Sequence, residues 1–386
     1  MHKIVMIGAV PPPYTGHSIS FLKLYEALSE DIENIEDVTY INTAPKNKHV
    51  TGKVTWSRIQ ENLLVLKQLW ISLRKTKPNT IYVTKGSTTV GFIRDLLTLF
   101  ISKVLSRESK FIIHLKGGNY DSFYDKQNIF LQLLIRFFLN KSDRIIVLGN
   151  SLVKMYDFYP KVKNKIIVVE NALTTPIKRN SHIHFDLSKK KIKLLFLSNL
   201  IYTKGYMDLL KAVEILIDKK IFHFHLTFAG AFMVSPDDPS GYDITSFEKE
   251  FLKKIKSDKL KEYTTYRGVV IGEEKEVLLK ESDIFILPTA YHVEGQPVSI
   301  IEAMAYGCAI ISTKYRSIPD IILENENGFY VEYGDPLSIV SKIEALLNDK
   351  EKLKKASLIS VDLYNKRFQW KIHYEKMRKI LLGSQI

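Results

Sequence analysis

Residues 283–307 read DIFILPTAYHVEGQPVSIIEAMAYG, and this stretch gives the clearest indication of the fold class. The apolar run 283–287 is typical of a buried strand, and Pro288 ends it. Pro297 suits the first position of a helix, where its missing N–H costs nothing, and Gly307 suits the position after the helix end. The stretch therefore predicts a strand, a loop and a helix, the unit from which parallel α/β sheets are built.

The same order of elements opens each half of the chain. Residues 3–10 form an apolar run, residues 11–16 a loop rich in proline and glycine, and Ser18 is the expected N-cap of the next helix. Residues 192–200 and 201–205 repeat the strand and the loop. Further apolar runs predict strands at residues 80–84, 110–115, 144–148, 165–169, 222–229, 263–270, 309–312 and 328–331. We expect an α/β protein with two Rossmann-like domains and a cleft between them.

The length of 386 residues exceeds what one hydrophobic core usually serves, roughly 250–300 residues. Residues 176–191 are polar, basic and poor in large apolar side chains, so we expect a linker there. The expected domains are residues 1–175 and 192–367. A final helix in residues 368–386 is expected to pack on either domain, including a return to the N-terminal one.

The composition is that of an ordinary globular protein, with 45% hydrophobic and 25% charged residues. The single cysteine, Cys308, cannot form an intrachain disulfide, and the N-terminal apolar run is too short for a signal peptide. No window of about 18 apolar residues is free of charge, so no membrane span is expected. We therefore expect a cytoplasmic protein.

The net charge of +14 is concentrated in the first half of the chain. Residues 1–185 hold 26 basic and 14 acidic residues, whereas residues 186–386 hold 30 and 28. A solvated basic face is one interpretation of this asymmetry. The other is a polyanionic partner for the first half: nucleic acid, anionic lipid or a phosphorylated substrate.

One predicted helix, residues 57–74, combines basic residues with an apolar stripe at spacings of three and four. The stripe consists of Ile59, Leu63, Leu66, Trp70 and Leu73. It is expected either to pack on the domain or to lie on an anionic membrane, and the two are compatible because the basic face is separate.

The loop and helix after Pro288 contain the most informative polar residues. The helix start exposes free N–H groups beside Gly295, where a phosphate can approach closely. Glu294 and Glu302 are eight residues apart and can reach different parts of one ligand, where carboxylates accept hydrogen bonds from hydroxyl pairs. The alternative is a helix-capping glutamate plus an exposed one.

These motifs resemble those of retaining glycosyltransferases of GT-B fold, family 4. The pattern from Glu294 to Glu302 resembles the E-x7-E signature of that family. Residues 197–205 look like its diphosphate-binding loop, and residues 8–16 like its N-terminal Gly-rich loop. Residues 112–118 resemble the strand that carries its acceptor-side histidine, and residues 169–172 match the strand that leaves its first domain. The motifs occur in family order.

The resemblance implies transfer of a sugar from a nucleotide diphospho-sugar, with UDP as the expected nucleotide, to a hydroxyl of a glycan acceptor. It places the donor on the second domain and the acceptor on the first. The implied catalytic residues are His114, Lys204 and Glu294. The implied donor-binding residues are Gly16, Asn199, Lys204, Gly205, Arg267, Glu294, Gly295, Gln296, Pro297, Val298 and Glu302.

Two departures from the family pattern concern the donor. Asn199 stands where Arg is common, so either Lys204 takes more of the diphosphate charge or Arg267 compensates, unless Arg267 is an ordinary surface residue. Gln296 replaces a commonly aromatic residue, which affects the sugar pocket. No Asp-x-Asp pair is present, so we expect no metal and no other cofactor, with Lys204 and the helix start stabilising the leaving diphosphate.

His114 ends an apolar strand, and without the resemblance it would be read equally well as a core histidine. The resemblance places the acceptor on the first domain, and the basic charge of that domain then leads to a hypothesis: a peripheral protein on the inner face of the cell membrane that extends a polyprenyl-diphosphate-linked glycan in bacterial surface polysaccharide synthesis. A nucleotide-sugar epimerase with a similar donor pocket is an alternative. A nucleic-acid-binding protein explains the charge but not the paired strand–loop–helix units, and no nucleic-acid partner is expected.

Overall fold

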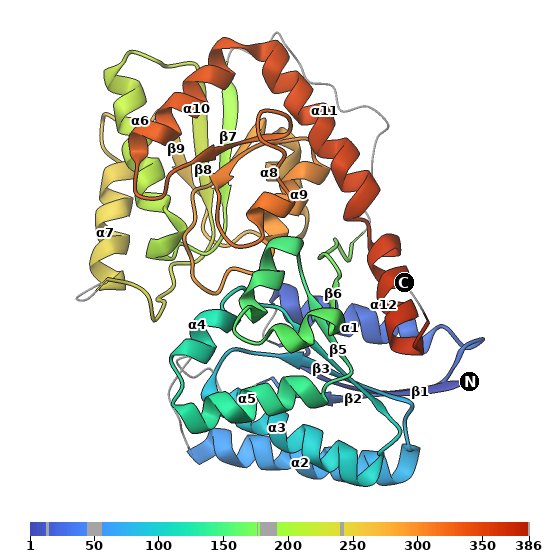
Figure 1. Cartoon of the computed structure of the whole chain (residues 1–386). Helices are drawn as coiled ribbons and strands as arrows, with labels where there is room; N and C mark the ends of the chain where they lie inside the picture. Colours follow the sequence, from blue (N-terminus) through green and yellow to red (C-terminus); the bar gives the residue numbers. More distant parts are fainter. Residues whose placement is uncertain (13–14, 45–55, 176, 178–190, 240–242, 385–386) are drawn as a thin grey trace. The chain divides into compact units, whose positions relative to one another are not determined.

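The computed structural model describes residues 1–12, 15–44, 56–175, 177, 191–239 and 243–384. It divides into two compact units (Figure 1). The N-terminal unit comprises Met1–Thr174 and Trp370–Ile386, and the C-terminal unit comprises Thr175–Gln369. Each unit holds a parallel six-stranded sheet with helices, which confirms the predicted α/β class with two Rossmann-like domains. Most of the predicted linker lies outside the described residues.

The sheet of the N-terminal unit has the strand order β2-β1-β3-β4-β5-β6. Its strands are β1 (His2–Gly8), β2 (Ile35–Asn42), β3 (Thr80–Lys85), β4 (Lys110–Leu115), β5 (Arg144–Val147) and β6 (Ile166–Val168). The order reverses between β1 and β3, and ligands of open parallel sheets bind beyond the carboxyl ends of strands at such a switch point. The edge strand β2 was not predicted, because its buried residues Ile35, Val38 and Ile41 are separated by polar ones.

Helices cover both faces of this sheet, and strand side chains alternate between the two cores. The helices are α1 (Gly16–Ser29), α2 (Trp56–Thr76), α3 (Thr89–Leu105), α4 (Tyr120–Asp125), α5 (Ile129–Lys141), η1 (Asn150–Tyr156), η2 (Pro160–Lys165) and α12 (Trp370–Leu382). Val5 and Ile7 of β1 join the core beneath α2, α3 and α5, whereas Ile4 and Met6 join the core beneath α1 and α12 (Figure 1). The last helix thus packs within the N-terminal unit.

The start of α1 differs from the prediction. Thr15, not Ser18, is the N-cap: its hydroxyl accepts a hydrogen bond from Ser18 N at 3.2 Å, and the Ser18 hydroxyl accepts one from Thr15 N at 3.0 Å. Ser18, the predicted N-cap, is therefore the third residue of the helix and the second member of a capping box with Thr15.

The apolar stripe predicted for α2 is also wrong in part. The buried residues are Val65, Leu69 and Leu73, spaced by four. Of the predicted stripe, Leu73 is buried, whereas Leu63 and Trp70 are 59% and 39% exposed, so the packing alternative does not hold for these two residues. Apolar residues occur on more than one face of α2, so periodicity alone did not identify the face that meets the sheet.

The sheet of the C-terminal unit has the order β12-β11-β10-β7-β8-β9 and reverses between β7 and β10. Its strands are β7 (Ile192–Leu197), β8 (Phe224–Ala229), β9 (Thr264–Tyr266), β10 (Ile284–Leu287), β11 (Ala309–Thr313) and β12 (Gly328–Val331). Its helices are η3 (Tyr202–Lys204), α6 (Tyr206–Asp218), α7 (Ile244–Ile255), α8 (Gly272–Glu281), α9 (Val298–Ala305), η4 (Ile318–Asp320), α10 (Pro336–Asn348) and α11 (Lys350–Arg367). The strand predicted over residues 263–270 is shorter, because Gly268 turns the chain with φ +68°.

Candidate active site

The candidate site of the C-terminal unit lies at the switch point of its sheet, where the loops after β7 and β10 meet. Gly205 has φ +73°, and a Cβ atom there would lie 2.3 Å from the carbonyl oxygen of Pro288. Ala290 N donates to Thr203 O at 2.8 Å, so the two loops are also hydrogen-bonded. Only glycine fits this left-handed, crowded position, and the predicted loops at residues 197–205 and 288–297 form one surface.

Lys204 and Glu294 are brought together on this surface. Lys204 Nζ lies 3.3 Å from Glu294 Oε2, and the two side chains are only 13% and 11% exposed. The ammonium also donates to Ser198 Oγ at 2.9 Å and lies 5.2 Å from the ring centroid of Tyr291. Ser198 and Tyr291 lie within the predicted stretches 197–205 and 283–307, but the sequence assigned neither of them a role. The site thus offers a fixed cation beside a carboxylate.

The amino end of α9 borders the same loop. Pro297 is the N-cap and Val298 the first helical residue, so the predicted position of Pro297 is wrong by one. Ser317 Oγ donates to Gly295 O at 2.5 Å and holds the loop in place. At the other end, Gly307 follows the C-cap with φ +81°, as predicted. The first turn of α9 presents N–H groups that can bind an anion.

Glu302 lies in α9 and is held by a neighbouring helix. Lys275 Nζ of α8 donates to Glu302 Oε1 at 2.6 Å, and the glutamate side chain is 19% exposed. Its second oxygen can accept from a hydroxyl group. Sequence reasoning did not find Lys275, because a lysine on a polar helix carries no signal of a partner 27 residues away.

Asn199 and Arg267, the two further candidates for contact with the diphosphate, are both exposed. Asn199 follows β7 and is exposed. Arg267 Nη2 donates to Glu274 Oε1 at 2.9 Å in an ion pair whose side chains are about half exposed. Gln296, in contrast, is buried at 3% exposed.

The imidazole of His292, adjacent to Tyr291, contacts the carboxyl group of Asp237 in the segment after β8. Burial, followed by the charges of Glu294 and Asp238, raises the pKa of Tyr291. The segment around Asp237 therefore lies against the loop that carries Glu294.

His114 and Gly16 belong to the N-terminal unit. His114 is fully buried, and its Nδ1 lies 2.7 Å from Tyr82 Oη. Among the described residues its Nε2 has no partner. Burial, followed by the charges of Lys116, His373 and His17, lowers the pKa of His114 well below its usual value, so the ring is neutral. Gly16 is the first residue of α1.

Within the described residues, no group of three or more His, Cys, Asp or Glu side chains could hold a metal ion. None of the described helices is long and apolar enough to cross a membrane.

Known proteins resemble both the sequence and the fold. The family model described as "Glycosyl transferases group 1" matches residues 178–358, a range that includes Lys204, Glu294 and Glu302. An uncharacterized glycosyltransferase of Methanocaldococcus jannaschii is 24% identical over 308 residues, covering 76% of this chain and 73% of that protein.

A relative with a named reaction is the GalNAc-α-(1→4)-GalNAc-α-(1→3)-diNAcBac-PP-undecaprenol α-1,4-N-acetyl-D-galactosaminyltransferase of Campylobacter jejuni. It is 28% identical over 211 residues, covering 54% of this chain and 51% of that protein. The structure of Anabaena HepE in complex with UDP matches with a TM-score of 0.70 at 13% identity, over 99% of this chain and 100% of that one, which shows the fold alone. The sequence matches support a group 1 glycosyltransferase, and the structural match supports the GT-B fold. The chain is therefore a transferase.

Proposed function

We propose that this chain is a retaining, metal-independent glycosyltransferase of family 4 that uses a UDP-sugar and extends a lipid-linked glycan in bacterial surface polysaccharide synthesis. The observation that carries the proposal is the Lys204–Glu294 pair beside the amino end of α9, at the switch point of a parallel sheet. The UDP complex of HepE and the undecaprenol-linked substrate in the name of the Campylobacter relative support the choice of donor and acceptor.

The geometry suits a leaving diphosphate. Negative charge grows on that group as the glycosidic bond breaks, and a fixed ammonium and helix amides stabilise it without rearranging. Lys204 and the first turn of α9 would hold the diphosphate, with Asn199 and Gly205 beside them. Glu294 would hold the donor sugar.

The remaining assignments concern the nucleoside and the acceptor. Glu302 would accept from the ribose hydroxyls, while Lys275 keeps its carboxylate oriented. The proton of the acceptor hydroxyl would pass to the departing diphosphate. His114, as a neutral ring, would then orient substrate groups and would not serve as an obligatory base.

Product analysis tests this reaction. With a UDP-sugar and a lipid-linked acceptor, ¹H NMR of the product should show a new glycosidic bond with the anomeric configuration of the donor. An inverted product would contradict the retaining reaction. Conversion of the sugar nucleotide in the absence of acceptor would favour an epimerase.

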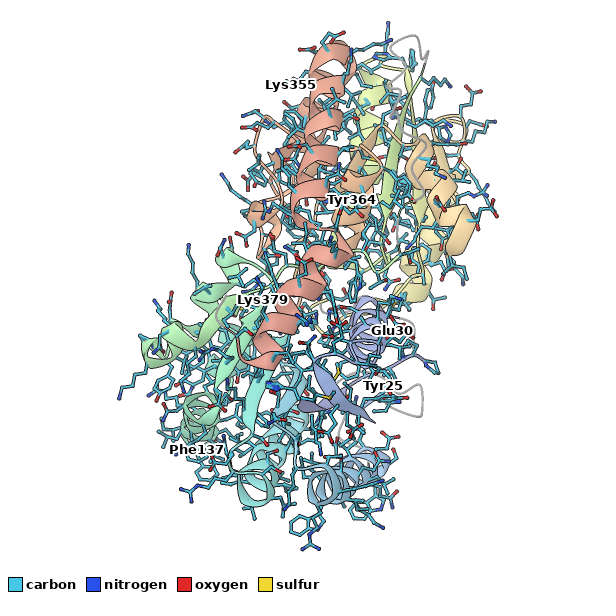
Figure 2. The ribbon with its side chains drawn as sticks, turned by 90° about the vertical axis from the view of Figure 1, so that its right-hand side faces the viewer. Tyr25, Glu30, Phe137, Lys355, Tyr364 and Lys379 are labelled. Atoms are coloured by element: carbon cyan, nitrogen blue, oxygen red, sulfur yellow. The ribbon has the colours of Figure 1, made fainter. Side chains whose placement is uncertain are left out.

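Peripheral membrane binding is part of the proposal, and an exposed apolar ridge supports it. The ridge is formed by one stripe on α3 and one on α5, joined by stacking of Phe100 on Phe137 at 5.7 Å. Its residues are between 38% and 73% exposed: Ile93, Leu97, Phe100, Val104, Ile129, Phe130, Leu133 and Phe137. Figure 2 shows Phe137 at the surface of this unit. Such a contiguous apolar surface typically marks an interaction site.

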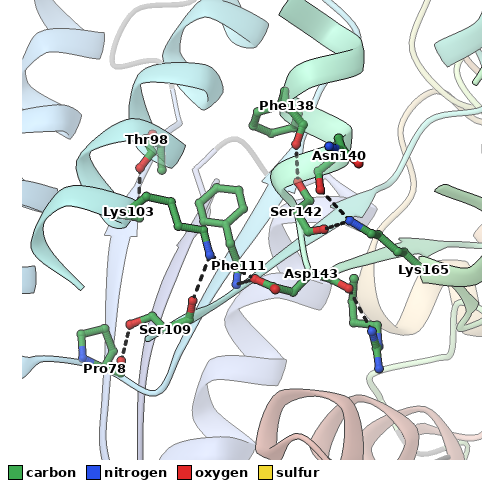
Figure 3. Close-up of polar contacts among 12 residues, drawn as sticks. Pro78, Thr98, Lys103, Ser109, Phe111, Phe138, Asn140, Ser142, Asp143 and Lys165 are labelled. Carbon is green, nitrogen blue, oxygen red and sulfur yellow. Dashed lines mark hydrogen bonds and ion pairs between the residues drawn. The ribbon is translucent and has the colours of Figure 1, made fainter. Parts of the chain in front are cut away.

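Basic residues stand at one end of the ridge, around a groove of about 480 Å³ that Phe100 and Phe137 also line. Lys103 contacts Asp143 and Ser109 O, each at 3.4 Å, and Lys165 donates to Asn140 O and Ser142 O (Figure 3). Arg107 and Lys141, which line the same groove, are exposed. Cations beside apolar side chains favour an anionic bilayer, at about 1 kcal/mol for each basic residue near the surface.

Vesicle flotation tests this surface. The protein should float with vesicles that contain phosphatidylglycerol, and salt should weaken the binding. Leu133→Glu should reduce binding about tenfold or more, because an apolar contact is replaced by a charge. Leu358→Glu is the matched control, since Leu358 is 53% exposed on α11 and Leu133 is 55% exposed. Equal binding to neutral vesicles, or no binding, would contradict this part of the proposal.

A further inference from the structure

The N-terminal unit contains a cavity of about 310 Å³ that no role assigned above uses. Ala9 follows β1, Thr84 to Gly86 end β3, and Lys116 follows β4, so the cavity lies at the carboxyl edge of the sheet. This edge includes the switch point between β1 and β3, where parallel sheets bind ligands. Residues of α2 and of the first turns of α3 complete the wall.

Cations dominate this wall. Among the described residues that line the cavity, four are basic and one is acidic: Arg58, Lys85, Arg94 and Lys116, with Glu61. The buried Asp95 neutralises Arg94, at 2.6 Å. Lys85 and Lys116 are only 3% and 5% exposed, so the remaining positive charge is held inside the protein.

The two buried lysines differ in what surrounds their charge. Lys85 Nζ donates to Tyr120 Oη at 2.6 Å and lies 4.2 Å from the centroid of that ring. Lys116 Nζ has no hydrogen-bond or ion-pair partner within the described part of the chain, and burial lowers its pKa to about 7. A buried ammonium without a partner destabilises the fold, so an anionic ligand is the group that would compensate it.

The start of α3 adds to the anion site. Thr88 is the N-cap of this 17-residue helix, and Gly91 N donates to its hydroxyl. The helix dipole therefore adds positive potential beside the lysines. The same helix carries part of the apolar ridge.

We propose that this cavity binds the diphosphate group of a lipid-linked diphosphate acceptor, with Lys116 and Lys85 as its cations. The inference rests on the proposed function, in which the donor diphosphate occupies the C-terminal unit and the acceptor remains to be placed. Two lysines and helix amides match the two phosphates of such a group, and the ridge on α3 is suited to its lipid.

Calorimetric titration of the full chain with geranyl diphosphate and, separately, with UDP tests the proposal. Lys116→Met should weaken geranyl diphosphate binding roughly 10–100-fold, the effect of losing a charge-assisted contact, and leave UDP binding unchanged. Lys204→Met should do the reverse. Lys116→Arg should restore much of the affinity, and Lys110→Met, which changes an exposed lysine at the other end of β4, should have no effect.

The outcomes separate this inference from the proposed function. Loss of geranyl diphosphate binding in Lys204→Met, with normal binding in Lys116→Met, would overturn the inference, as would wild-type binding in both variants. If UDP does not bind the wild-type protein, the proposed function fails, while Lys116-dependent binding of the prenyl compound would still support an anion site. Titration with inorganic pyrophosphate distinguishes a free diphosphate from a lipid-linked one as the ligand. If pyrophosphate binds as tightly as geranyl diphosphate, a lipid-linked ligand is rejected.

Discussion

Both units place lysines at or beyond the carboxyl ends of strands in a six-stranded parallel sheet, but in opposite electrostatic settings. In the C-terminal unit, Lys204 is paired with Glu294 and hydrogen-bonded to Ser198. In the N-terminal unit, Lys116 is buried and contacts no acidic side chain among the described residues, and Lys85 contacts aromatic rings and a phenol. The same fold can thus build a site in which a lysine and a glutamate offset each other's charge, suited to a ligand with both sugar and diphosphate parts. It can also build a site with an excess of positive charge, suited to an anion.

The largest expected effect is on kcat, and it concerns the Lys204–Glu294 site of the C-terminal unit. Lys204→Met keeps the length of the side chain but removes the charge that faces the leaving group, so kcat should fall about 10²–10³-fold. Steady-state kinetics with a UDP-sugar measures this, and Lys204→Arg should retain part of the activity. Lys211→Met changes an exposed lysine on α6 and should not alter kcat. A wild-type kcat in Lys204→Met would remove this lysine from the site.

The next effect tests whether the loops after β7 and β10 are held by close packing. Gly205→Ala adds a Cβ atom 2.3 Å from Pro288 O at φ +73°, whereas Gly334→Ala meets nothing within 4 Å at φ +76°. Left-handed strain is thus matched, at about 1–2 kcal/mol, and the clash should add about 1–3 kcal/mol for Gly205→Ala alone. Urea unfolding measures the difference, and equal losses would show that the loop contact is unimportant.

The smallest expected effect is on the free energy of unfolding, and it concerns the difference between the buried Lys116 and the ion-paired Lys204. Burial lowers the pKa of Lys116 from 10.5 to about 7, so between these values the unfolded chain binds a proton that the folded chain does not. Stability from this group therefore rises with pH across the window and is lowest below pH 7. Lys116→Met should stabilise the protein at pH 6, with a gain that shrinks towards pH 10.

Urea unfolding at pH 6 and pH 9 checks this sign. Lys204→Met should act in the opposite direction, because it leaves the largely buried Glu294 without its cation. Destabilisation by Lys116→Met at pH 6 would mean that Lys116 has a structural partner and does not await a ligand.

The sequence predicted much of the fold because buried parallel strands are short apolar runs. It missed β2, where polar residues separate Ile35, Val38 and Ile41. Of the stripe that it predicted on α2, only Leu73 is among the buried residues of that helix. Those errors share a cause: burial is decided by what an element packs against, which local spacing does not contain.

The residues of the candidate sites were likewise predicted only in part. The pairing of Lys204 with Glu294 joins residues 90 positions apart. The loop before the predicted helix singled out Glu294, whereas only the resemblance to a family supplied Lys204. Lys85 and Lys116 were not singled out, since a lysine after a strand carries no sign of its burial. Lys85 ends β3 and Lys116 follows β4, and this position in the sequence does not by itself separate buried lysines from exposed ones.

Titration of the wild-type protein with UDP in the presence of EDTA tests the central claim most directly, because that claim assigns the diphosphate to Lys204 and the amides of α9. We expect UDP to bind at least tenfold more tightly than uridine, EDTA to leave this ratio unchanged, and Lys204→Met to remove the difference. Binding of UDP that disappears with EDTA and returns with Mg²⁺ or Mn²⁺ would contradict the account.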